Sequence, residues 1–530
     1  MLKDLLKEGN PNPPSTINHC DVVEGGFFRS GDNMRDSGLK NKVVSGVFWA
    51  FSERIVSQGV SFILSILLAR LLMPSEYGLI ALVLVFTNLA NVFVTNGMGE
   101  TLIQKKDADE TDFSSLFYFS VVFSIALYTI LFFSAPFIGA FYDNSELVSV
   151  LRVIALILPL SSIITIQQAY VSKKMMFKKM FISTIGGTIA SGLIGIGMAY
   201  LGYGVWSLVA QYLVNAIVNT IVLFFIAPWR PKLLFSMEAI KKLVGFGWKL
   251  VAANFINIFY FELRSLMIGK LYTVTALAYY NRGNQFPTLL INSIDTAIGK
   301  VLFPAMAEVN HDVAHLKNVT RRSMKITAYL IFPLMIGLLS IAPSLIVVLL
   351  TQKWAAAVPF LQICCVYWLF QPMQTANWQA IKALGRSDML VKLEIIKKII
   401  GVSLLLISMN ISVYAIALSN AVFACISMII NMMPNKKLMN YSMREQFRDL
   451  APSLLLSLVM GGSIYTISWL ALPAILILLL QIVGGAIIYV GASHLFNIDS
   501  YVYLTSMLST KLRRRNTVTP LTQGIVIKKW

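Results

Sequence analysis

Long apolar segments follow one another almost without pause from about Val43 to Phe496, and the junctions between them alternate in charge. One set of junctions is rich in lysine and arginine, whereas the intervening set holds only Arg282 and Lys353. Short loops that carry Lys and Arg stay on the cytoplasmic side of a membrane. The alternation therefore predicts a chain that crosses a membrane many times with both termini inside. The basic junctions lie near residues 105–106, 173–179, 230–242, 317–325, 382–392 and 436–448.

The composition agrees with a membrane location, because 57% of the residues are hydrophobic and only 13% are charged, which is outside the usual range of soluble domains. A helical span needs about 20 residues to cross roughly 30 Å of hydrocarbon. Only helices satisfy every backbone group in such consecutive spans. The sequence therefore predicts an all-α polytopic membrane protein with about fourteen spans. These spans are expected at residues 43–71, 78–98, 115–140, 147–171, 181–201, 205–228, 243–271, 284–306, 325–350, 356–381, 389–410, 412–433, 450–470 and 472–496.

The first six predicted spans and the next six share features of an internal repeat. Arg70 ends the first span and Lys270 ends the seventh, and Ser134-Ala135-Pro136 recurs as Ile341-Ala342-Pro343 at the outer ends of spans three and nine. Six spans per unit keep both copies in the same orientation, as in a parallel repeat about an axis along the membrane normal. We therefore predict two six-helix bundles around a central cleft, with two additional C-terminal helices.

The expected organisation has five parts. They are a disordered cytoplasmic tail over residues 1–40, an N-terminal bundle over 41–232, a C-terminal bundle over 236–435, helices 13 and 14 over 448–496, and a basic cytoplasmic tail over 497–530. The first tail lacks the apolar core of a signal peptide, and Met34 within it is a candidate internal start. The four cysteines lack disulfide or metal spacing, so no metal site is expected.

Several short stretches resemble the signatures of bacterial polysaccharide flippases. They are Leu68–Gly78 (LARLLMPSEYG), Gly97–Gly99 with Ile103–Lys106, Ile268–Leu271, Tyr279–Arg282 and Leu302–Glu308. In order and spacing they are similar to the Wzx-type members of the polysaccharide transporter family, within the multidrug/oligosaccharidyl-lipid/polysaccharide superfamily. The branch of colanic-acid and teichuronic-acid exporters is the most similar. The resemblance extends from about Lys40 to Asn497.

This resemblance implies alternating-access transport of an undecaprenyl-diphosphate-linked oligosaccharide across the bacterial cytoplasmic membrane during surface polysaccharide biosynthesis. It implies membrane lipids as surroundings, a polysaccharide polymerase and a chain-length regulator as candidate partners, and no catalytic residue or cofactor. One position departs from the family. Members often carry an acidic residue five positions before Gly269, where this chain has Arg264, so a coupling role of that acid does not transfer.

Ionisable residues at membrane depth are costly, so each is a candidate functional residue. Gln58, Ser61 and Ser65 all lie within about 40° of Arg54 around the first predicted span, at 100° per residue. The seventh span, its repeat equivalent, has a looser polar stripe of Asn254, Asn257, Arg264 and Ser265. Both stripes are expected to face the central cleft.

The remaining charged candidates fall into two groups. Arg70, Lys270 and Lys300 are candidate contacts to a lipid diphosphate, although Arg70 and Lys270, near outer span ends, are alternatively snorkelling residues. Glu53, Glu262 and Asp295 are candidates for proton coupling, because low dielectric favours a protonated carboxyl, or are simply partners of buried cations.

The net charge of +19 does not indicate nucleic-acid binding, because Lys and Arg never gather on one soluble domain. Three classes of membrane protein remain as candidates for the function. A lipid-linked oligosaccharide flippase fits best, because the cleft candidates are more basic than acidic. A multidrug or cation antiporter of the same superfamily should have an acidic cleft instead. A membrane glycan polymerase, the third class, needs longer outer loops.

Overall fold

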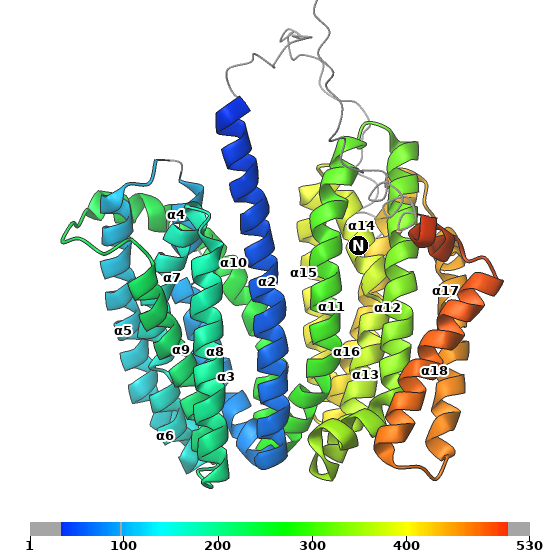
Figure 1. Ribbon diagram of the computed structural model, residues 1–530, viewed down its shortest axis with the longest axis horizontal. Coiled ribbons are helices and arrows are strands. Elements are labelled where there is room, and N and C mark those ends of the chain that lie inside the picture. Colours follow the sequence, from blue (N-terminus) through cyan, green and yellow to red (C-terminus); the bar gives the residue numbers. More distant parts are fainter. Residues whose placement is uncertain (1–32, 96–97, 106, 507–530) are drawn as a thin grey trace, which may run out of the picture.

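The computed structural model describes residues 33–95, 98–105 and 107–506 of the chain. Every regular element in these ranges is helical, which confirms the all-α fold (Figure 1). Twelve helical stretches are long and apolar enough to cross a membrane. Helices α11 (Val274–Glu308) and α15 (Ser387–Ser408) fall outside these twelve because they carry many polar and charged residues. The total of fourteen spans and the orientation in the membrane therefore stay predictions.

The remaining helices follow the predicted spans, with short breaks. The first half contains α2 (Asn33–Leu71), α3 (Pro74–Thr95), α4 (Met98–Gln104), α5 (Glu110–Phe141), α6 (Ser145–Ile154), α7 (Ile157–Lys173), α8 (Phe177–Tyr200) and α9 (Val205–Ile226). The second half contains α10 (Met237–Leu271), α12 (Val313–Leu350), η1 (Gln352–Ala357), α13 (Val358–Leu369), α14 (Gln371–Ala383), α16 (Val413–Met439), α17 (Met443–Thr466), η2 (Ile467–Trp469) and α18 (Ala474–Leu495).

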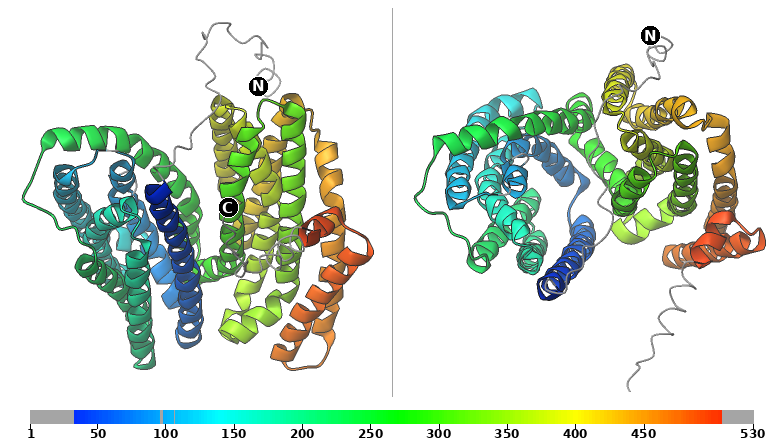
Figure 2. Two further views of the ribbon diagram at one scale, coloured as in Figure 1. Left: turned by 45° about the horizontal axis from the view of Figure 1, so that its top comes forward. Right: turned by 90° about the horizontal axis from the view of Figure 1, so that it is seen from above.

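Two bundles stand side by side in Figures 1 and 2. Helices α2–α9 form one bundle and α11–α16 the other, while α17 and α18 pack on α12. Helix α10 packs chiefly against α3, α4 and α5, and secondarily against α11. The predicted boundary assigned this helix to the C-terminal bundle, but its packing joins it to the first bundle.

Both predicted tails contain helical residues. Helix α2 begins at Asn33, so residues 33–40 continue its hydrogen-bond ladder and are not a disordered tail, since extending an existing helix is much easier than starting one. Residues 1–32, the rest of that predicted tail, lie outside the described residues. At the other end, residues 499–506 are helical, and Ile498, Tyr501 and Leu504 pack beside Tyr329 and Tyr489.

Capping side chains set the start of several helices. Thr273 accepts a hydrogen bond from the backbone N–H of Ala276, so α11 begins at Val274. This is well before the predicted start at residue 284. Arg282, which hydropathy placed in an outer junction, therefore lies within α11, about two turns from its first residue.

The two halves meet at the end opposite the basic junctions. A continuous apolar core there contains Leu68 and Leu82 from the first half with Ile268, Leu277 and Phe360 from the second. Helices α3 and α11 approach so closely that a Cβ on Gly78 would lie 1.7 Å from the backbone oxygen of Val274. We call this region the outer closure, because the predicted orientation places it on the outer side of the membrane. It positions the cavity that lies between the bundles.

Candidate functional site

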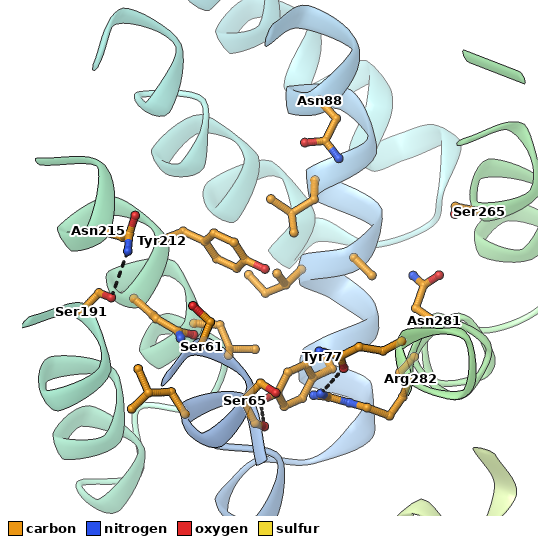
Figure 3. A pocket seen from close by; sticks show the side chains of 18 of the residues that line it. Ser61, Ser65, Tyr77, Asn88, Ser191, Tyr212, Asn215, Ser265, Asn281 and Arg282 are labelled. Atoms are coloured by element: carbon orange, nitrogen blue, oxygen red, sulfur yellow. Dashed lines mark hydrogen bonds between the residues drawn. The ribbon is translucent and has the colours of Figure 1, made fainter. Parts of the chain in front are cut away.

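A polar cavity of about 590 Å³ lies between the two bundles. Its walls come from α2, α3, α8 and α9 of the first bundle and from α10 and α11 (Figure 3). The lining side chains are mostly uncharged hydrogen-bonding groups. They include Ser61, Ser65, Tyr77, Asn88, Thr188, Ser191, Gln211, Tyr212, Asn215, Ser265, Asn281 and Gln285.

Arg282 and Glu262 are the charged residues among the side chains that line this cavity. Arg282 is 6% exposed and donates from Nη1 to Oε1 of Gln285 at 2.6 Å. Its guanidinium carbon lies 4.4 Å from the ring centroid of Tyr77 and 5.1 Å from that of Trp354. Both rings hold the guanidinium by cation–π contact. Figure 3 shows the Arg282 side chain at the edge of the cavity.

The sequence of α11 explains why Arg282 faces the cavity. Ala278, Asn281, Arg282 and Gln285 all line it, and the spacing of three and four residues places them on one helix face. Of the two rings that contact the guanidinium, Tyr77 packs against the core of the outer closure, and Trp354 donates to the oxygen of Ala69 beside it. The positive charge therefore lies toward the closed, outer part of the cavity.

The opposite wall is formed by α8 and α9, which pack closely. A Cβ on Gly187 of α8 would lie 3.0 Å from the backbone oxygen of Asn215 in α9, so only a small residue fits there. Asn215 donates to the hydroxyl oxygen of Ser191 at 3.4 Å. Gln211 and Tyr212 precede Asn215 by one turn and also line the cavity. Sequence reasoning missed this wall, although polar residues spaced by four in an otherwise apolar span are a detectable signal.

Of the predicted site residues, Glu262 lies in the cavity lining. Its Oε1 accepts a hydrogen bond from Asn88 of α3 at 3.2 Å. Both residues also line a smaller adjoining pocket with Asn91 and Thr95. Glu262 thus links α10 to the first bundle through a polar contact at membrane depth.

The structure places only part of the stripe predicted on the first span in the cavity lining. Ser61 and Ser65 line the cavity, but Arg54 and Gln58 do not. Arg54 is exposed and donates to Oγ1 of Thr296 in α11 at 3.3 Å. Gln58 is partly buried.

Arg264, predicted to face the cleft, does not line this cavity. Glu262 and Ser265 of the same helix do, and Arg264 is two residues from Glu262, about 200° around the helix axis. Arg264 is 4% exposed and its guanidinium carbon lies 5.4 Å from the ring centroid of Tyr260. Within the described residues its Nε and Nη2 have no hydrogen-bond partner.

Arg70 and Lys270 bind backbone oxygens at the outer closure. Arg70 donates from Nε to the oxygen of Leu349 at 2.8 Å and from Nη2 to that of Val348, at the end of α12. Lys270 donates to the oxygen of Phe141, at the end of α5, and pairs with Asp143 at 3.1 Å. The first helix of each predicted repeat thus holds the third helix of the other. Both contacts favour a structural role over headgroup binding.

The other predicted residues lie away from the cavity lining. Asn257 accepts a hydrogen bond from Lys398, and Asp295 accepts one from Thr375 at 2.6 Å. Asn254 and Glu53 are partly buried. The side chain of Lys300 lies outside the described part of the structure. Among the described residues, no group of three or more His, Cys, Asp or Glu residues is arranged to hold a metal ion.

A second cavity, of about 460 Å³, lies between α3, α5 and α10. Its lining is apolar throughout and rich in aromatic rings, among them Phe93, Phe119, Trp248 and Phe255. That lining has no charged side chain, and the indole N–H of Trp248 is its one side-chain hydrogen-bond donor, so it suits a polar headgroup far less well than the central cavity does. The central cavity is therefore the candidate functional site.

Comparison with known proteins agrees with this architecture. Residues 67–359, more than half of the chain, match the family described as polysaccharide biosynthesis protein. The chain belongs to this family. It is 22% identical over 460 residues to the teichuronic acid biosynthesis protein TuaB of Bacillus subtilis, covering 85% of this chain and 95% of that protein. It is 23% identical to the lipopolysaccharide biosynthesis protein WzxC of Escherichia coli, covering 68% of this chain and 73% of that protein.

Solved structures show the same fold. The lipid II flippase MurJ in an inward closed conformation superposes with a TM-score of 0.69 at 14% identity, covering 86% of this chain and 99% of that one. An inward-facing multidrug transporter of the MATE family superposes with a TM-score of 0.55 at 15% identity, covering 73% and 96%. This family member is therefore a multi-pass membrane protein with the MurJ and MATE type of fold.

Proposed function

We propose that this protein is a flippase that moves an anionic lipid-linked oligosaccharide across the bacterial cytoplasmic membrane by alternating access. The observation that carries the proposal is the polar cavity between two bundles, with Arg282 at its closed end. The family, whose relatives are named for surface polysaccharide biosynthesis, and the MurJ type of fold support the same conclusion.

In this proposal Arg282 binds the diphosphate of the substrate. A guanidinium presents several N–H donors in a planar fork that matches phosphate oxygens, and such charge-assisted bonds are stronger than neutral ones. Tyr77 and Trp354 orient the group, and Gln285 accepts a hydrogen bond from Nη1. A guanidinium has five N–H donors, which is more than Gln285 and the nearby Tyr77 hydroxyl can occupy, so the group can also bind an anion that enters the cavity.

The uncharged wall suits the glycan. Sugar hydroxyls both donate and accept hydrogen bonds, and so do the Asn, Gln, Ser and Tyr side chains of α8, α9 and α11 that line the cavity. Burying such a headgroup within the membrane requires that its polar groups find partners, since each unpaired one is costly. The cavity supplies these partners, whereas the surrounding lipid does not.

We also propose Glu262 as the group that couples transport to a proton or cation. Of the three predicted acids, it is the one in the lining of the central cavity. Its contact with Asn88 joins α10 to α3, so a change in its charge acts on the packing of α10 against the first bundle, at the wall of the cavity. A polysaccharide polymerase and a chain-length regulator are the proposed partners, and we propose no enzymatic activity.

The test is export of polymer in a strain that lacks its own flippase. Arg282→Gln should abolish export, whereas Arg282→Lys should retain part of it because the positive charge remains. Arg152→Gln is the matched control. Arg152 also stacks on a ring, with its guanidinium carbon 4.3 Å from the centroid of Phe132, but it lies outside the cavity lining. Full export by Arg282→Gln, at normal protein levels, contradicts the proposal.

A further inference from the structure

A basic pocket of about 400 Å³ lies far from the central cavity, between the start of α12 and the helical residues 499–506. Its lining combines three cations with hydrogen-bonding side chains. The lining residues are Asn318, Arg321, Arg322, Lys325, Ile326, Asp499, Ser500 and Tyr503. We propose that this pocket binds the phosphate headgroup of an anionic phospholipid.

The cations of the pocket differ in how well they are already paired. Arg321 and Lys325 both contact Asp449, with nitrogen–oxygen distances of 2.5 and 3.6 Å, and Lys325 also pairs with Asp499 at 3.0 Å. Arg322 makes no ion pair or hydrogen bond within the described residues. Its guanidinium carbon lies 3.5 Å from the ring centroid of Tyr503, which orients the planar group but satisfies none of its N–H donors.

The position of the pocket along α12 places it at headgroup level. This helix has 38 residues and is therefore about 57 Å long, against about 30 Å of hydrocarbon. Its last residue, Leu350, belongs to the outer end, so about twenty residues before it cross the hydrocarbon. Residues 318–326 then lie at and just beyond the headgroup layer of the other leaflet, where long Lys and Arg side chains reach back to the lipid phosphates and attract anionic lipids.

Apolar side chains beside the pocket favour a lipid over a free anion. Leu495, Phe496 and Val502 are 77%, 74% and 47% exposed, and they belong to the same end of the chain as Asp499 and Tyr503. Large apolar groups next to a cationic pocket match a lipid, whose phosphate binds the cations while its acyl chains contact the apolar side chains. Such a lipid would join residues 499–506 to α12, in addition to the Lys325–Asp499 pair.

The test compares lipid retention by purified full-length protein in nanodiscs of phosphatidylcholine that contain a small fraction of phosphatidylglycerol. Native mass spectrometry counts the phosphatidylglycerol that remains bound. Wild type should retain it in preference to phosphatidylcholine. Arg322→Ala should weaken the apparent affinity by about tenfold or more, because it removes a charge-assisted contact. Arg444→Ala is the matched control, since Arg444 is exposed on α17 at the same end.

A second variant tests whether the orientation of the Arg322 guanidinium matters as well as its charge. Tyr503→Leu keeps every cation but removes the ring that orients Arg322, and it should also weaken retention, whereas Arg444→Ala should change it less than about twofold. The proposal is overturned if phosphatidylglycerol binds no better than phosphatidylcholine, or if Arg322→Ala and Arg444→Ala behave alike. Millimolar inorganic phosphate is the competing arm. If phosphate alone displaces the lipid, the pocket is a free-anion site and the lipid assignment is wrong.

Discussion

Replacing Gly78 with alanine should open the outer closure. A Cβ at this position would lie 1.7 Å from the backbone oxygen of Val274 and 2.4 Å from its carbonyl carbon. Both atoms are backbone, so no side chain can rotate away. Ordinary contact therefore requires α3 and α11 to separate by about 1.5 Å or more at this end.

Such a separation also breaks the neighbouring contacts between the halves. Trp354 donates to the oxygen of Ala69 at 2.8 Å, and Arg70 donates to that of Leu349 at the same distance. Both bonds would exceed normal hydrogen-bond length. Overpacking of this kind costs about 1–3 kcal/mol. If the cost falls on the closed arrangement alone, the ratio of outer-open to outer-closed protein rises by about 5- to 150-fold.

The assay uses a cysteine introduced at Ser65, which lines the central cavity, in a background without the native cysteines. A membrane-impermeant maleimide added outside should label Gly78→Ala faster than wild type. Gly59→Ala is the control, because nothing lies within 4 Å of a Cβ at Gly59, and alanine there should slightly stabilise α2. Equal labelling and equal thermal stability of the two alanine variants would refute the reasoning.

Three further predictions concern buried polar groups. Trp354→Phe, at a site that is 0% exposed, removes the bond to Ala69 and should cost about 1–3 kcal/mol, seen as a lower Tm in detergent. Asn377→Ala should have a similar effect, because Asn377 bonds to both Gln446 and Asn435 at 0% exposure; a Tm equal to that of wild type contradicts this. Arg264→Met should keep transport activity and leave the Tm unchanged or higher, because it replaces a buried charge that has no carboxylate partner among the described residues with an apolar side chain. Loss of transport by a stable variant would return Arg264 to the site.

Hydropathy and charge predicted the helices well, because both are local properties of the chain. The outcome for Arg282 shows the limit of this approach. The run Asn281-Arg282-Gly283-Asn284-Gln285 is polar, so hydropathy starts the predicted span only at residue 284. The Thr273 cap starts α11 earlier, at Val274. Within this run Asn281, Arg282 and Gln285 lie on the helix face that lines the cavity, and Arg282 is the cation that hydropathy assigned to a loop.

The repeat was informative in a different way. Comparing the two halves of the sequence identified Arg70 and Lys270 as equivalents, and the structure gives them equivalent contacts, each at the end of the opposite repeat's third helix. These partners are distant in sequence and depend on how the bundles dock, so no local pattern reveals them. The same limit applies to Glu262 and Arg264, which the sequence names as candidates for different roles on the same helix. Only the packing of α10 decides that Glu262, and not Arg264, lines the central cavity.

The most direct measurement is headgroup translocation in vesicles. Purified protein is reconstituted with a fluorescent lipid-diphosphate-linked oligosaccharide, and a membrane-impermeant quencher reports the fraction that reaches the outer leaflet. Wild type and Arg152→Gln should move the headgroup, and Arg282→Gln should not. All three proteins should be reconstituted into the vesicles in equal amounts. Translocation at the wild-type rate by Arg282→Gln, or none by the wild type with this class of lipid, would contradict the account.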